Sequence, residues 1–194
     1  RLYLQPTGGL SDAPPTEASA ASQFRPDASA GQRSVLAPGG DVWARLPSYR
    51  WQAPQSGQAL TFETAMLTQD QVMVGTASVD LYMQSTADDA DLQVTLSEIR
   101  PDGQERFVQS GWLRASQRKL AAEATPLWPQ HTHLREDVQP LSHVGGADWS
   151  QVRVGVPAFA HVFRKGSRLR LTIDTPGVLT PRPVMQPCCA SITT

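Results

Sequence analysis

Hydrophobic and polar residues alternate along several short stretches of this chain, which is the pattern of β-strands with two unlike faces. In the clearest example, apolar residues take every second position and polar residues the positions between: Leu92, Val94 and Leu96 against Gln93, Thr95 and Ser97. This stretch predicts a strand whose apolar face covers a core and whose polar face meets water.

A turn sequence follows that strand, Arg-Pro-Asp-Gly at residues 100–103. Pro101 presets φ for the first central position of a turn, and Gly103 tolerates the positive φ from which a second strand can start. Residues 88–114 are therefore predicted to form one long β-hairpin.

Other stretches carry the same strand signal, at residues 2–5, 59–64, 71–75, 78–85, 151–157 and 168–174. In the last of these, Arg168, Arg170 and Thr172 are expected to face outward, and the turn at 164–167 predicts a second hairpin. Helical periodicity is weak, and only one short helical turn is expected, around 119–124. Roughly eight short strands predict an all-β protein, a jelly-roll β-sandwich.

The length of 194 residues fits one domain, which we expect to span residues 1–178. Residues 7–58 are rich in Pro, Gly, Ala and Ser, but apolar anchors such as Phe24, Trp43 and Trp51 indicate an irregular excursion within this domain. Residues 179–194 are Pro-rich and atypical, and we expect a disordered or truncated tail. Because a strand begins almost at the first residue, which is not methionine, the chain is expected to be a fragment.

The formal net charge of −1 gives no reason to expect nucleic acid or an anionic membrane surface as a partner. No apolar run approaches the ~20 residues that span a bilayer. Cys188 and Cys189 are adjacent, which is unfavourable geometry for a mutual disulfide. These features do not indicate a compartment or an oligomeric state.

Catalytic signals are weak. The chain contains no Gly-x-Ser-x-Gly sequence, the usual setting of a hydrolase nucleophile, and His143 and His161 are not linked by spacing to a serine or a carboxylate. Glycine-rich phosphate loops are also missing. We assign no catalytic residue and no cofactor.

Two groups of residues offer possible metal ligands. His131 and His133 would point the same way on an extended segment, as zinc ligands can, but a third ligand is needed and only Glu136 and Asp137 are near in sequence. The alternative is an ordinary polar loop.

An acidic cluster, Asp88, Asp89 and Asp91, could bind calcium through its carboxylates, or could simply be solvated. For both groups the simpler interpretation is favoured, and no metal site is assigned.

Tryptophans suggest a contact surface. The five of them could form a sugar-binding platform, although most tryptophans are core or interface anchors. Trp112 is opposite in phase to Leu113, so both faces of its strand carry a large apolar group and both are expected to be covered. This pattern favours contact with another domain, or with the excursion at 7–58, over a sugar site. Trp112 and Arg114, which share a face, are the candidate residues for contact with another domain.

The chain resembles the C-terminal non-catalytic domain of the X-Pro dipeptidyl-peptidase and cocaine esterase (CocE/NonD) hydrolases. The resemblance rests on LTFETAMLTQDQVMVGTASVDLYMQSTADDADLQVTLSEIRPDGQERFVQSGWLRASQR at 60–118 and HVFRKGSRLRLTIDTP at 161–176, and shorter segments extend it from residue 2 to about residue 177. It implies a jelly roll similar to galactose-binding domains, which follows an α/β-hydrolase domain in the same polypeptide. The catalytic Ser, Asp and His of that family lie upstream, and none corresponds to a residue of this chain.

Three functions remain open at this point. The leading hypothesis is an accessory domain that packs on the α/β-hydrolase domain of an ester- or X-Pro-cleaving serine hydrolase. A free-standing carbohydrate-binding module is the first alternative, and an enzyme complete in itself is the second. The resemblance does not identify the acyl or peptide substrate.

Overall fold

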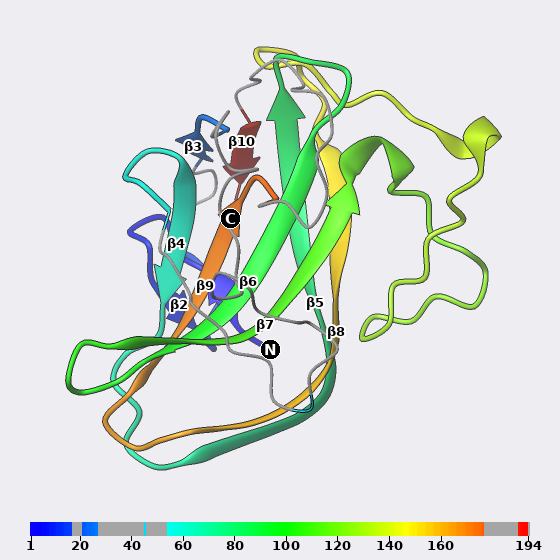
Figure 1. The fold of residues 1–194 in the computed structure, drawn as a ribbon. Helices are drawn as coiled ribbons and strands as arrows, with labels where there is room; N and C mark the ends of the chain where they lie inside the picture. The colour runs from blue at the N-terminus through cyan, green and yellow to red at the C-terminus, as the bar shows by residue number, and fades with distance from the viewer. Residues whose placement is uncertain (17–20, 27–44, 46–53, 177–189, 194) are drawn as a thin grey trace.

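Two four-stranded antiparallel sheets make up the body of the protein in a computed structural model, which describes residues 1–16, 21–26, 45, 54–176 and 190–193 (Figure 1). The β5 sheet has the order β3 (Ala21–Phe24), β10 (Ala190–Thr193), β5 (Gln71–Ser85) and β8 (Ser150–Phe163). The β6 sheet has the order β4 (Ala59–Glu63), β9 (Arg168–Asp174), β6 (Asp91–Ile99) and β7 (Glu105–Arg114). A small sheet pairs β1 (Tyr3–Leu4) with β2 (Leu10–Ser11), and two 3₁₀ turns, η2 (Ala115–Gln117) and η3 (Arg135–Asp137), lie between β7 and β8. The all-β sandwich predicted from the alternation is confirmed.

The hydrophobic core contains apolar side chains from both sheets. Each sheet contributes the apolar half of its alternating positions, as expected for strands that bury one face against a facing sheet. The most deeply buried of these side chains are at most 2% exposed: Phe62, Leu81, Met83, Leu92, Val94, Val152, Val154, Val156, Phe163 and Ile173.

The predicted β6–β7 hairpin is confirmed. Its turn is closed by the backbone N–H of Gly103, which donates to the carbonyl of Arg100 at 2.9 Å, and Gly103 has φ of 79°. Further along β7, a Cβ added to Gly111 would lie 2.0 Å from the carbonyl oxygen of Gly155 in β8. The two sheets therefore approach backbone to backbone at this point, which requires glycine.

The prediction that the polar face of β6 meets water is wrong. Thr95 and Ser97 are fully buried and Gln93 is 5% exposed. Partners on β7 satisfy them: Thr95 Oγ1 is hydrogen-bonded to Ser110 Oγ at 2.8 Å, and Ser97 Oγ donates to Glu105 Oε1 at 2.5 Å. Alternation gives the side on which a residue lies, but not whether water reaches that side.

The second predicted hairpin is also wrong, because β8 pairs with β5 whereas β9 pairs with β4 and β6. The turn at 164–167 crosses from one sheet to the other. Thr172 of β9, expected to face water, is 1% exposed. At 119–124, where the sequence allows a short helical turn, the Ala124 backbone N–H donates to the carbonyl of Ala121 at 3.2 Å, which closes one isolated turn, and the nearest 3₁₀ residues form η2.

Most of the expected excursion, at 17–20, 27–44 and 46–53, lies outside the described residues, as do 179–189 and 194 of the expected tail. Strand β10, the described part of that tail, is paired with both β3 and β5. The limits of the domain and the character of the remaining tail stay predictions. In the part of the chain that the structure describes, no helix is long and apolar enough to span a membrane.

Candidate domain interface

Trp112 lies on β7 directly opposite Gln93 of β6. Its indole Nε1–H donates to Gln93 Oε1 at 2.8 Å, and the residue remains 48% exposed. The next residue, Leu113, points the other way and is 5% exposed in the core. The predicted phase of Trp112 is thus correct, and half of this large side chain is open to contact.

The orientation of Trp112 is fixed by further hydrogen bonds. The Gln93 side chain also donates, through Nε2, to Thr95 Oγ1 at 3.1 Å, and Thr95 in turn bonds to Ser110. A buried and connected row of polar groups holds its members in one geometry, because each would lose its partner by moving. The indole is therefore presented in a defined position.

Arg114, two residues further along β7, forms a bidentate ion pair with Asp91 of β6. Its Nε lies 2.9 Å from Asp91 Oδ1 and its Nη2 lies 3.1 Å from Oδ2. The hydrogen bonds and the charge of Asp91 raise the pKa of Arg114. The arginine side chain is still 41% exposed, so part of it lies at the protein surface.

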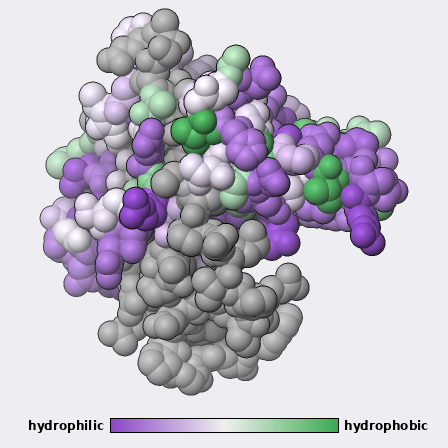
Figure 2. Space-filling view, turned by 90° about the horizontal axis from the view of Figure 1, so that it is seen from above, coloured by the Kyte–Doolittle hydropathy of each residue, from purple (hydrophilic) through white to green (hydrophobic). Residues whose placement is uncertain are grey.

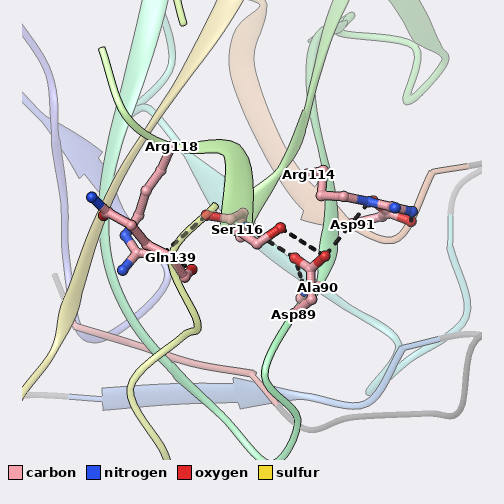
Figure 3. A network of polar contacts seen from close by, with 8 residues as sticks. Asp89, Ala90, Asp91, Arg114, Ser116, Arg118 and Gln139 are labelled. Atoms are coloured by element: carbon pink, nitrogen blue, oxygen red, sulfur yellow. Dashed lines mark hydrogen bonds and ion pairs between the residues drawn. The ribbon is translucent and has the colours of Figure 1, made fainter. Parts of the chain in front are cut away.

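Asp89 lies between Arg114 and Ser116 (Figure 3). One of its carboxylate oxygens accepts the backbone N–H of Ala90 and of Ser116, at 2.8 and 2.9 Å, and the other accepts the Ser116 hydroxyl at 2.8 Å. Arg118 then donates to the carbonyl oxygens of Gln139 and Pro140, at 2.5 and 3.0 Å. The Asp89 contacts join the start of β6 to the chain that leaves β7, and the Arg118 contacts join that chain to the segment before β8.

The structure does not unite the acidic cluster as a calcium site. Asp88 contacts His143 Nε2 at 3.0 Å, whereas Asp89 and Asp91 face Ser116 and Arg114. Among the described residues, no three His, Cys, Asp or Glu side chains are grouped so that they could hold a metal ion.

His131 and His133 do lie near one another, with ring centroids 5.8 Å apart. Burial and the neighbouring His133 lower the pKa of His131, which favours its neutral form. Of the two proposed further ligands, Asp137 instead forms an ion pair with Lys119. The described part of this loop offers two imidazoles without a third ligand.

The remaining candidates for chemistry have structural partners. His161 Nε2 contacts the buried Glu98 at 3.1 Å, and in the described residues neither His143 nor His161 has a hydrogen bond to a serine hydroxyl.

Of the other tryptophans considered for a sugar-binding platform, Trp43 and Trp51 lie outside the described residues, while Trp128, in the segment between β7 and β8, is 49% exposed.

One surface feature was missed from the sequence. Val72 and Val74 are predicted strand residues, but they are 68% and 77% exposed. The signal was present, because Val72, Met73 and Val74 form an unbroken apolar run and a strand with such a run is apolar on both faces.

Comparison with known proteins adds an independent finding. A family model described as the X-Pro dipeptidyl-peptidase C-terminal non-catalytic domain matches residues 1–178. Proteins of Mycobacterium bovis and Mycobacterium tuberculosis that carry the provisional name serine esterase are each 28% identical to this chain over 171 residues. The alignment covers 84% of this chain but only 26% of those proteins, so the chain spans about a quarter of their length.

Solved structures share the fold. A CocE/NonD family hydrolase from Staphylococcus aureus superposes with a TM-score of 0.69 at 19% identity, covering 99% of this chain and 33% of that one. An aminopeptidase from a Thaumarchaeota archaeon gives a TM-score of 0.66 at 16% identity, covering 98% of this chain and 34% of that one. An α-amino acid ester hydrolase gives 0.64 at 17% identity, with coverages of 98% and 33%. In all three, a domain like this one is about a third of a longer polypeptide.

Proposed function

Because the chain belongs to the X-Pro dipeptidyl-peptidase C-terminal non-catalytic domain family, we propose that it serves as the accessory β-sandwich of a CocE-like serine hydrolase. In this role it packs on the α/β-hydrolase domain of the same polypeptide and supports the active site there. The parent enzyme cleaves ester or X-Pro peptide bonds.

One observation carries the proposal: nearly the whole chain, residues 1–178, matches a domain described as non-catalytic. The coverage of relatives supports it, since the solved neighbours hold about two thirds of their length outside the matched part. The names of those neighbours, an aminopeptidase and an α-amino acid ester hydrolase, favour amide or ester substrates.

We place part of the contact at Trp112 and Arg114. A half-exposed indole held by a hydrogen bond to the buried Gln93 loses little conformational freedom when a partner covers it, and tryptophan and arginine are the side chains that most often dominate interfaces. Arg114, two residues further along the same strand, adds a charged side chain that is 41% exposed.

The test is Trp112→Ala in the full polypeptide, with Trp128→Ala as the matched control, because the two tryptophans have nearly the same exposure, 48% and 49%. Truncation of a central interface tryptophan costs about 2 kcal/mol or more. We expect Trp112→Ala to lower the unfolding temperature of the hydrolase domain and to reduce kcat/KM for p-nitrophenyl acetate, and Trp128→Ala to change neither. Equal behaviour of the two variants would count against this interface.

A further inference from the structure

Strands β5 and β8 pair along almost their whole length, but the pairing shifts between Gly75 and Ala77, and Gly75 has φ of 120°. A β-bulge of this type bends the strands and increases their twist. In Figure 1 the two strands run side by side and curl around the lower end of the sandwich. The irregularity divides their outer face into two parts.

The part of the outer face that directly follows the bulge in β5 is contacted by this chain itself at Ser78 and at its β8 partner Gly155. Ser78 Oγ donates to the carbonyl oxygen of Pro126 at 2.6 Å. Gly155 lies against the buried ring of Pro129, whose Cγ would be 3.1 Å from an added Cβ. The segment between β7 and β8 therefore covers these strands here.

The part before the bulge is apolar and open. Val72 lies opposite Val162, and Val74 lies opposite Ala160, so the four side chains share one face. Val72 and Val74 are 68% and 77% exposed, Ala160 is exposed and Val162 is half-buried. We call these four residues the apolar strip.

The apolar strip has sharp limits. At one end, Asp70 forms an ion pair with Arg164 at 2.8 Å. On the inner side of the same ribbon, Met73 packs against the core. Figure 2 views the molecule from above, away from the lower end around which β5 and β8 curl. The coloured surface in this view is mostly hydrophilic, and its strongly hydrophobic residues are set apart from one another. The strip is thus a continuous apolar surface without a charged side chain, which suits an apolar protein surface and not a glycan or a nucleic acid.

We propose that the apolar strip is a docking surface for an apolar patch of the hydrolase domain in the same polypeptide. The proposal rests on the proposed function and adds a second point of contact, distinct from Trp112 and Arg114. About two thirds of each solved neighbour lies outside the part that this chain matches, so a large covalently linked partner is expected.

Size favours a linked domain over a second copy of the chain. A stable interface between separate proteins takes about 20 to 30 residues from each partner, far more than these four side chains provide. Two domains joined in one chain meet at a high effective concentration, so a small apolar contact is enough to hold them in register.

Chemical labelling of the full polypeptide tests the docking. N-ethylmaleimide is applied to two variants, Val74→Cys and the reference Asp102→Cys, which lies at the exposed β6–β7 turn. Peptide mapping distinguishes the label on each new cysteine from label on Cys188 and Cys189. We expect Cys at position 74 to react at least tenfold more slowly than Cys at position 102 under native conditions, and equally fast in urea. Val72→Cys provides a second variant at the same face.

The outcomes separate the two proposals. Fast native labelling at position 74 overturns the docking surface, and if a Trp112→Cys variant is protected in parallel, the accessory role still stands. Fast labelling at both positions overturns both. Protection at position 74 that disappears on dilution would identify a second copy as the occupant and would also overturn the inference.

Discussion

Gly111→Ala is the substitution for which the structure predicts the largest effect from one added methyl group. The new Cβ would lie 2.0 Å from the carbonyl oxygen of Gly155, whereas ordinary contacts of this kind begin at 3.4 Å. Backbone atoms on both sides cannot rotate away, so β7 and β8 would have to separate by more than about an ångström, which disturbs close packing of the core.

Overpacking of this kind costs about 1–3 kcal/mol and sometimes more, and we expect Gly111→Ala to reach about 3 kcal/mol. For a chain of this size, that corresponds to a fall in Tm of about 6–12 °C. Gly155→Ala is the matched control, because its Cβ would meet the side chain of Pro129 at 3.1 Å, a much milder contact than 2.0 Å from a backbone carbonyl oxygen. Thermal unfolding followed by circular dichroism measures both. A Gly111→Ala variant that melts within about 2 °C of the parent would refute the close approach of the sheets.

Three further predictions concern buried and acidic groups. Burial raises the pKa of Glu98, but hydrogen bonds from the Arg164 backbone N–H and from His161 lower it. The hydrogen bonds outweigh burial, so the pKa of Glu98 lies below its ordinary value. Its contribution to stability is therefore present above the unfolded pKa and is lost as pH falls through the folded pKa; Glu98→Gln should flatten the curve of Tm against pH in the acid range, and an unchanged curve would contradict this. Asp89→Ala removes the acceptor of two backbone N–H groups and of the Ser116 hydroxyl, and should lower the unfolding free energy in urea by about 2 kcal/mol; a loss below about 0.5 kcal/mol would show that water replaces the carboxylate. The carboxylates of Asp88, Asp89 and Asp91 contact His143, Ser116 and Arg114 of this chain, so neither calcium nor a chelator should shift Tm. A rise in Tm with calcium would restore the hypothesis of a calcium site.

Local sequence determined the elements whose cause is local. The alternation of Leu92, Val94 and Leu96 placed these residues in the core, and Pro101 with Gly103 gave the turn between β6 and β7. Both features follow from neighbours in the chain, through strand periodicity and turn conformation.

Where the sequence failed, the cause is long-range. Thr95 is buried because Ser110, fifteen residues later, supplies its partner, and β8 and β9 fall in different sheets because each finds its partner strand elsewhere. In the candidate interface, the phase of Trp112 was predictable, but its hydrogen bond to Gln93, nineteen residues away, was not. Pairing across such separations depends on the whole fold, which no single stretch encodes.

In the role that we propose, this domain supports catalysis performed by another part of its polypeptide. Labelling the full polypeptide with a fluorophosphonate, which reacts with activated serines, followed by mapping of the modified peptide, tests this most directly. We predict a single labelled serine upstream of Arg1, within a Gly-x-Ser-x-Gly sequence, and no label in residues 1–194. A labelled serine within residues 1–194 would contradict this supporting role.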